Sequence, residues 1–237
     1  MFLLSYKKDE WIFRAFHKRI FRAPTLNDLY YTLVGNTKLN PEYTSQWDAG
    51  IDYKGKRFHF AVDGYYNHID DKIVAIPMKC QFRWSMVNFG KVKSYGASFS
   101  GGYNQDWGKF SLAANANYTY QIDKDYTMPS DPEYKNYIPY SPMHSGSVIL
   151  DLGYDSYSLC TSFLYTGERF ALVSNNADDL LGDWYTIDLK LNKRFKIGKY
   201  VLQTTLECNN LTDSRHEVVK RYPMPGRNWK CTVKFEL

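Results

Sequence analysis

The stretch from Arg227 to Leu237 alternates between polar and apolar residues, with an apolar residue at every odd position from Trp229 onward. Successive side chains of a strand point to opposite faces, so this pattern predicts a two-faced β-strand. The core of a soluble sandwich or a lipid bilayer could cover the apolar face of such a strand. The rest of the sequence has to decide between these two environments.

The same two-residue period recurs upstream, over residues 58–67, 110–120, 185–195 and 200–209. In each segment one face is mostly apolar or small, and the other carries mainly polar side chains such as Asn, Asp, Thr or Lys. The alternation of residues 11–22 is less regular and does not assign their faces. A strand of about 11 residues tilted by about 45° rises about 25 Å, which is the height of the apolar band of an outer-membrane barrel.

Short and long connections alternate along the chain. The short ones carry Gly, Asp or Asn, which suit tight hairpin turns. Strict alternation places all the long connections on one rim of a sheet, as in outer-membrane barrels, whereas soluble sandwiches have no reason to sort their loops by length. The long connections are expected at residues 22–43, 70–91, 122–142, 169–182 and 212–226.

The composition agrees with a membrane barrel and excludes a helical membrane protein. Mean hydropathy is −0.50, and no run approaches the about 20 consecutive apolar residues that a spanning helix needs. Barrel strands are apolar only at alternate positions, so their average hydropathy stays low. The 21 Tyr, 14 Phe and 6 Trp suit two aromatic girdles, and Trp47 and Tyr53 are examples near the two ends of one strand.

Charge and cysteine usage argue against other classes of protein. The net charge of +5 is scattered without a basic block, so nucleic-acid binding is not expected. The cysteines form no CxxC pair, so neither a metal site nor a disulfide framework is expected. Two of them, Cys208 and Cys231, fall on apolar faces and act as small apolar residues. The four cysteines are Cys80, Cys160, Cys208 and Cys231.

Together these patterns predict an all-β protein, an antiparallel transmembrane β-barrel with about eleven strands, long loops on one rim and short turns on the other. Closed single-chain bacterial barrels normally have an even number of strands. The first residues, beginning MFLLSYKKD, lack the features of a signal peptide. We therefore expect the chain to be the C-terminal half of a larger barrel.

Four motifs follow one another along the chain: FRAPTLNDLY at residues 21–30, GNTKLNPE at 35–42, ECNNLTD at 207–213 and YPMPGR at 222–227. In this order and at this spacing they resemble motifs of TonB-dependent outer-membrane receptors of the cobalamin and iron-siderophore type. The resemblance implies a 22-stranded barrel around an N-terminal plug. Residues 1–237 would be the C-terminal part of that barrel, with the plug domain and the N-terminal strands absent.

The resemblance also implies a function. The receptor would take up a scarce and bulky ligand, either cobalamin or a ferric siderophore or haem, by TonB-dependent active transport in the outer membrane of a Gram-negative bacterium. It would be neither an enzyme nor dependent on a cofactor. The implied partners are the outer-membrane lipid bilayer, the TonB complex acting through the missing plug, the small-molecule ligand and an extracellular lipoprotein.

Two groups of residues are candidates for a site. Aromatic and cationic side chains in the long loops offer contact area to a ligand and pairing to its carboxylate or phosphate groups; they are Tyr30, Tyr31, Arg83, Trp84, Tyr126, Tyr134, Tyr137, Arg169 and Arg221. The motif residues are expected to be structural, with Arg22, Asp28 and Glu42 as a charge-paired anchor. The motif residues are Arg22, Pro24, Asp28, Pro41, Glu42, Asn210, Pro223, Pro225, Gly226 and Arg227.

Two other functions stay open at the level of the sequence. A passive porin-like or adhesin barrel needs neither a plug nor TonB, and plug sequence upstream would distinguish the receptor from it. A barrel hydrolase would need a Ser and a His on the same wall. Ser141 and His144 lie close together in the sequence, but the five histidines form no recognisable catalytic constellation.

Overall fold

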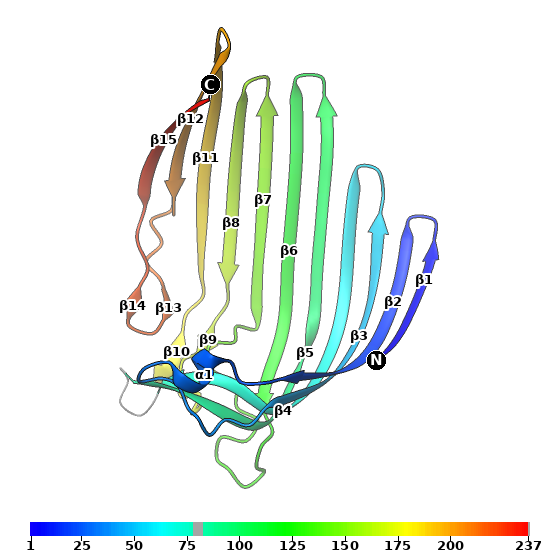
Figure 1. Ribbon diagram of the computed structural model, residues 1–237, viewed down its shortest axis with the longest axis vertical. Helices are drawn as coiled ribbons and strands as arrows, with labels where there is room; N and C mark the ends of the chain where they lie inside the picture. Colours follow the sequence, from blue (N-terminus) through cyan, green and yellow to red (C-terminus); the bar gives the residue numbers. More distant parts are fainter. Residues whose placement is uncertain (78–82, 237) are drawn as a thin grey trace.

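The computed structural model describes residues 1–77 and 83–236, which form one curved antiparallel sheet of eleven strands (Figure 1). Each inner strand pairs with the strand of the sheet that precedes it in the chain and with the one that follows it, and the first and last strands form the two edges. The predicted number of strands in the wall is confirmed. The strands are β1 (Phe2–Lys8), β2 (Trp11–Arg22), β3 (Glu42–Lys54), β4 (Phe58–Pro77), β5 (Trp84–Trp107), β6 (Phe110–Asp125), β7 (His144–Tyr154), β8 (Tyr157–Thr166), β11 (Trp184–Ile197), β12 (Tyr200–Asn209) and β15 (Asn228–Glu236).

The connections are sorted by length, as the sequence predicts. All the short turns lie at one end of the sheet and all the long loops at the other (Figure 1). Four of the short turns contain a residue with positive φ, which Asp and Gly adopt at low cost. These residues are Asp9, Gly108, Asp155 and Gly198.

The register assigns one face of the sheet to apolar side chains along its whole width. Trp47 on β3 lies opposite Tyr66 on β4, which lies opposite Tyr95 on β5, so these rings share the outward face. On β15 the alternate apolar residues are exposed, with Trp229 at 72% and Val233 at 63%. Within the described residues the only other sheets have two strands each, so no second layer covers this face. The described residues therefore do not form a two-layer sandwich, and the uncovered apolar face has the pattern of strands that face lipid.

The pairing of β2 explains why the alternation of its residues does not assign its two faces. Its outward face carries Trp11 and Phe13, opposite Tyr53 and Ile51 of β3. Its inward face also holds apolar residues beside Arg14, so both faces have mixed character. The faces follow from pairing with β3 and not from the pattern of β2 itself.

The predicted loop at residues 70–91 is wrong over most of its length. Strands β4 and β5 stay paired up to Pro77 and Trp84, far beyond the wall. Asp71 has a positive φ of 54° and drops out of the register, after which the pairing resumes at Lys72. One residue is skipped on each strand and the register is the same on both sides, so the pairing is interrupted at Asp71 without ending the hairpin.

Figure 1 shows this hairpin bending across the loop end of the sheet. The described hydrophobic core lies beneath it: Ile69, Phe89, Val92 and Ile138 are buried together. We call this end of the molecule the loop cap. It consists of residues 23–41, 69–77, 83–92, 126–143, 167–183 and 210–227.

Short elements inside the loop cap occupy parts of three of the predicted loops. They are α1 (Leu26–Tyr30), β9 (Arg169–Phe170), the 3₁₀ turn η1 (Ala177–Asp179), β10 (Leu180–Leu181), β13 (Glu217–Val219) and β14 (Tyr222–Pro223). No helix in the described part of the chain is long and apolar enough to cross a membrane. The outer edges of β1 and β15 end the sheet on its two sides (Figure 1), so eleven strands form an open wall.

The structure describes three of the four cysteines. Cys160, Cys208 and Cys231 are free thiols. Cys208 is buried on the outward face between Leu189 and Trp229 of the neighbouring strands. Cys80 and the rest of residues 78–82 lie outside the described residues.

Candidate functional site

The inward face of the wall carries paired charges near β2. Arg14 donates to Asp52 on β3 at 2.5 Å and also pairs with Asp63 on β4. The register places Arg14, Asp52 and Asp63 on the face opposite to the aromatic rings. Partly exposed ion pairs contribute only about 0–1 kcal/mol each to stability. Their consequence is therefore a hydrated, charged lining on this side of the sheet.

A second charged group lies at the other side of the wall. Glu207 on β12 accepts from Lys190 on β11 and Lys230 on β15, both at 3.3 Å. Next to it, the Thr205 hydroxyl donates to the Asn192 amide oxygen at 2.6 Å. Polar groups thus line the concave face from β2 to β15, as in a water-filled barrel interior.

Helix α1 is held by the first motif. Thr25 and Asp28 form a capping box, in which the Asp28 N–H donates to the Thr25 hydroxyl at 3.1 Å and the Thr25 N–H donates to the Asp28 carboxylate at 2.9 Å. Arg22 pairs with Asp28 at 3.2 Å and with Glu42 at 3.5 Å, so the structure contains the predicted anchor. Hydrogen bonding from the Thr25 N–H, with a contribution from the Arg22 charge, lowers the pKa of Asp28.

The second motif ties the first loop to the long hairpin. Asn36 donates from its amide to the Met86 carbonyl at 3.0 Å, and the Met86 N–H donates to the Val34 carbonyl at 2.9 Å. Further along, the Asn40 N–H donates to the Asn88 side chain at 2.8 Å, and the Asn88 amide donates back to the Asn40 carbonyl at 3.1 Å. The loop therefore adds main-chain pairing to the edge of β5.

The last two motifs hold each other. Asn210, with a positive φ of 52°, donates from its side chain to the carbonyls of Ser214 at 2.9 Å and Pro225 at 3.3 Å. The Arg227 N–H donates to the Asp213 carboxylate at 2.8 Å. These contacts fold residues 210–227 into a closed loop that returns the chain to the wall at β15.

Arg169 connects two loops of the cap, residues 167–183 and 210–227. It is buried, and its guanidinium donates to the carbonyls of Glu217 at 2.6 Å and Val218 at 3.1 Å, and to that of Gly182 at 3.4 Å. Burial lowers the pKa of the Arg169 guanidinium. All these acceptors belong to the main chain, so Arg169 is placed as a packing residue of the cap, although the sequence put it among the ligand contacts.

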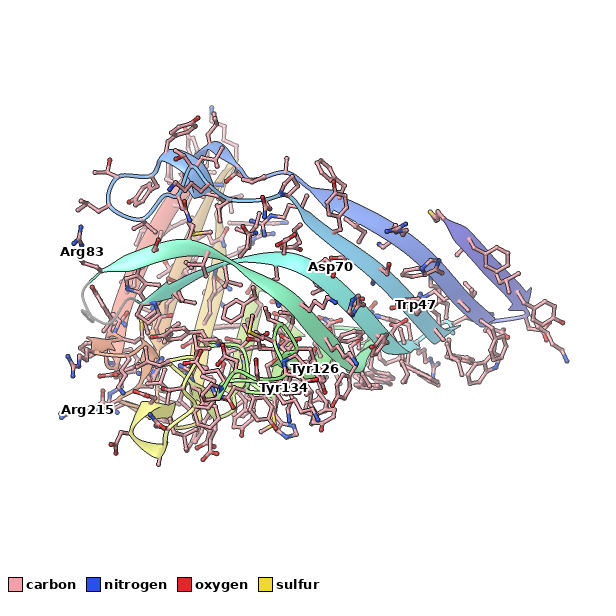
Figure 2. All side chains as sticks on the ribbon, turned by 90° about the horizontal axis from the view of Figure 1, so that it is seen from below. Trp47, Asp70, Arg83, Tyr126, Tyr134 and Arg215 are labelled. Carbon is pink, nitrogen blue, oxygen red and sulfur yellow. The ribbon has the colours of Figure 1, made fainter. Side chains whose placement is uncertain are left out.

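Three of the five predicted loop tyrosines, Tyr126, Tyr134 and Tyr137, lie on the outer rim. Tyr137 pairs with Lys124 in an isolated bridge, and Lys124 points to the same side as the outward-facing rings of β6. Tyr126 and Tyr134 pack edge to face, with ring centres 5.5 Å apart, and Figure 2 shows them side by side. Tyr126 also faces the Lys93 ammonium at 4.4 Å. The arrangement turns these rings away from the concave face.

Trp84 and Arg221 come together although they lie far apart in the sequence. Trp84, at the start of β5, packs on Tyr140 with ring centres 5.4 Å apart. A pocket of about 20 Å³ between Trp84, Tyr140, Arg221 and Tyr222 joins the hairpin to the last loop. A shallower and larger apolar hollow of about 440 Å³ continues from Trp84 along the β13–β14 hairpin to Met224.

The remaining predicted ligand contacts are exposed but separate. Tyr30 and Tyr31 stand on and after α1 with most of their surface accessible. Arg83 is exposed beside Trp84, at the edge of the cap in Figure 2. The structure does not gather the nine predicted residues into one site.

Sequence reasoning missed the residues that join the loops. Asn175 has a positive φ of 51° and forms two hydrogen bonds with the main chain of Tyr137. The Tyr137 N–H donates to the Asn175 side-chain oxygen at 2.5 Å, and the Asn175 amide donates to the Tyr137 carbonyl at 3.1 Å. Lys220 reaches Asp179 at 3.0 Å. The pair Asn175-Asn176 in a loop was a turn signal, but nothing in the sequence names its distant partner.

A hydrolytic or metal site is not found in the described part of the chain. Ser141 donates to Asp123 at 2.6 Å, whereas His144 contacts the Tyr118 hydroxyl at 2.8 Å, so the two nearby residues have different partners. Among the residues that the structure describes, no group of three or more His, Cys, Asp or Glu could hold a metal ion.

Comparison with known proteins gives the chain a family context. A family model described as TonB dependent receptor-like, beta-barrel, matches residues 2–211. The vitamin B12 transporter BtuB of Vibrio vulnificus is 23% identical over 220 residues, covering 91% of this chain and 33% of that relative. BtuB of Photobacterium profundum is 27% identical over 86 residues, covering 35% of this chain and 14% of that relative. The chain therefore spans about a third of the length of the first relative and less of the second.

Solved structures share the fold. The ferric citrate transporter FecA in its unliganded form superposes with a TM-score of 0.73 at 16% identity, covering 96% of this chain and 36% of that one. The copper transporter OprC gives 0.72 at 16% identity, covering 98% and 38%. The siderophore receptor PiuA from Acinetobacter baumannii gives 0.72 at 15% identity, covering 98% and 34%. At these identities the likeness concerns the fold alone.

Proposed function

Because this chain belongs to the TonB-dependent receptor β-barrel family, we propose that it forms the C-terminal part of an outer-membrane receptor for TonB-dependent uptake of a scarce and bulky ligand. The match of the family model to residues 2–211 is the observation that carries this proposal. In this proposal the receptor also comprises a plug domain and the strands that complete a 22-stranded barrel.

Two features of the geometry support uptake. The concave face is lined with charged and polar groups, as a route for a polar ligand requires, while the apolar side chains of the wall point outward. The long loops interlock into one loop cap at the end that would face outside. Affinity for a dilute ligand needs such an ordered surface, because ordering loops on binding costs free energy.

Cobalamin is the first candidate ligand, and a ferric siderophore or haem is the second. Two relatives are vitamin B12 transporters, which favours cobalamin, and the structural neighbours include receptors for iron chelates. Within the cap, Trp84 and Arg221 are the predicted contacts that line one pocket, and Tyr30, Tyr31 and Arg83 are exposed candidates. An enzymatic activity is not part of the proposal.

Growth under limitation tests the function. A strain that lacks the gene is compared with its parent when cobalamin is limiting, and again when iron is supplied only as a siderophore complex or haem. The expected result is a growth defect of the deletion strain under one of the two conditions. Deletion of TonB in the parent strain is expected to give the same defect. Normal growth under both conditions would remove both ligands, and a TonB-independent defect would support the passive porin.

A matched pair of substitutions addresses the ligand contacts. Trp84→Ala combined with Arg221→Gln is expected to lower uptake of the limiting ligand, because it removes an aromatic surface and a cation from one pocket. Trp229→Ala is the control, since Trp229 lies on the lipid-facing side of β15. Equal uptake by both variants would place the ligand elsewhere in the cap.

A further inference from the structure

One row of residues on the outward face is basic. Arg19 on β2 lies opposite Ser45 on β3, which lies opposite His68 on β4. The row continues to Lys93 on β5 and Lys124 on β6. Directly paired residues point to the same side of a sheet, and strands lie about 4.8 Å apart, so this basic row extends over about 19 Å of the outer surface.

An aromatic row runs parallel to the basic row, two residues nearer the middle of the strands. It contains His17, Trp47, Tyr66 and Tyr95, each opposite the next. His17 stacks on Trp47 at 4.7 Å, and Trp47 approaches Tyr66 at 5.8 Å between ring centres. Such a belt marks the level where the hydrocarbon of a bilayer meets its headgroups. The basic row therefore lies at the level of the headgroups, on the loop side.

The cations of the row are held at that level. Lys93 lies over the Tyr126 ring at 4.4 Å, and Lys124 lies over the Tyr137 ring at 4.5 Å, so the two ammonium groups are directed toward the rim of the wall. An ammonium over a ring face still has N–H donors for an anion. Arg19 is exposed and forms no ion pair with any residue that the structure describes.

The acidic group nearest to the row in register is already partnered. Asp70, on the outward face one step beyond the row, lies opposite Lys91 and pairs with His68 at 3.6 Å. Figure 2 labels Trp47 and Asp70, which lie on either side of the basic row along β3 and β4. Arg19, Lys93 and Lys124 thus remain as a surplus of positive charge.

We propose that Arg19, Lys93 and Lys124 form a binding site for the phosphate groups of lipids in the surrounding outer leaflet. Arg pairs with phosphate through two parallel hydrogen bonds, and Lys supplies a point charge. A protein partner fits less well, because the aromatic row below and the uncovered apolar face place this surface beside lipid. The inference rests on the proposed outer-membrane location.

The test uses the full-length protein in detergent and in vesicles. Vesicles of phosphatidylcholine are doped with lipid A that carries two phosphates, or with the same lipid after removal of its phosphates. Lipid retained by the protein after extraction is counted by native mass spectrometry. The variant Arg19→Gln, Lys93→Gln, Lys124→Gln is compared with Lys8→Gln, Lys109→Gln, Lys193→Gln, which removes the same charge at the turn end of the wall.

The native protein and the turn-end variant are expected to retain the phosphorylated lipid about tenfold more than the basic-row variant does, since each cation near an anionic lipid surface favours binding. Equal retention by the two variants would overturn the proposal, as would equal retention of the dephosphorylated lipid. Inorganic phosphate is also added at a concentration that saturates its own binding to the protein. Complete displacement of the lipid at that concentration would identify a site for free phosphate and would also overturn the proposal.

Two further readouts separate this proposal from the proposed function. Heat-modifiable mobility on gels shows whether each variant has formed its barrel. Fractionation of the cell shows whether the protein is in the outer membrane at all. A protein found elsewhere defeats the proposed function, whereas an outer-membrane protein with normal uptake and no preference for phosphorylated lipid defeats only the lipid site.

Discussion

The wall and the loop cap treat apolar side chains in opposite ways. In the wall, Val62 and Leu206 face outward with 44% and 50% of their surface exposed. In the cap, Val92 and Ile138 are buried, at 0% and 4% exposure. Apolar surface leaves water wherever it can, so the two regions must have different surroundings. The cap has a buried core of its own, whereas the wall leaves its apolar face uncovered, as the proposed location in a membrane requires.

The two regions also differ in what holds their backbone. The wall relies on the regular pairing of eleven strands. The cap relies on side chains that bond to main-chain carbonyls, either of another loop, as Asn36, Asn175 and Arg169 do, or of the same loop, as Asn210 does. Loss of one such side chain leaves buried groups without partners, which costs more than the bond itself gains. The cap is therefore the region where single polar substitutions have local effects.

The largest effect is expected from shortening a phenylalanine in the cap. Phe89→Ala removes a buried ring from the cluster with Ile69 and Val92, and should lower the local stability of the cap by about 3–5 kcal/mol. Phe99→Ala, on the outward face of the same strand, is the control and should cost far less, because lipid fills the space. Hydrogen exchange of residues 126–143 measures the difference. Similar losses for both would refute the contrast.

A charge on the outward face tests the wall. Val62→Lys places an ammonium in the apolar band and should destabilise the barrel by about 2–4 kcal/mol. Ser100→Lys, in the row adjacent to Val62 and Phe99 but on the concave face, should change stability little because that face is wet. Urea unfolding in lipid vesicles gives both values. A Ser100 variant as unstable as the Val62 variant would mean that the concave face is not hydrated.

Removing Asn210 tests the side-chain bracing of the last loop. Asn210→Ala leaves the carbonyl of Pro225 and the N–H of Ser214 without their partner, and should cost about 1–3 kcal/mol. The neighbouring Asn209→Ala loses an exposed hydrogen bond to Asn228 and should cost much less. Limited proteolysis within residues 212–226 measures the opening. No difference between the variants would show that the loop does not depend on this bracing.

The smallest effect is expected from pH acting on Asp28. Its pKa is below the ordinary value of 3.8, so the charged form stabilises the folded loop. This contribution is complete above the unfolded pKa and is lost as pH falls through the folded pKa, in the acidic window that begins at the unfolded pKa.

Asp28→Asn should remove this pH dependence and cost about 1 kcal/mol, the usual contribution of a capping residue. Protection of the α1 backbone N–H groups from hydrogen exchange, followed across that window, provides the measurement. A native protein whose α1 protection stays constant down to pH 2 would contradict the role of Asp28.

The amino-acid sequence predicted the wall because each strand carries its own signal. Alternation along one strand, the residues of its turn and its length depend only on neighbours in the chain, and they predicted the all-β class, the strand number and the two rims. The sequence did not predict the long β4–β5 hairpin, because Asp70 and Asp71 resemble loop residues when only their neighbours in the chain are considered. The strand continues past them because it pairs with β5.

The same distinction between local signals and contacts set by the fold applies to the candidate site residues. The motifs around Asp28 and Asn210 could be recognised in the sequence, yet that the last two motifs bond to each other is decided by the fold. The fold likewise buries Arg169, turns Tyr126 and Tyr137 to the outer rim and brings Trp84 to Arg221. The two faces of a strand have different surroundings, so polar and apolar residues alternate along its sequence. A contact between loops depends instead on the path of the whole chain. The alternation within each strand therefore predicted an outward face suited to lipid, and the path of the folded chain fixed which loop residues meet.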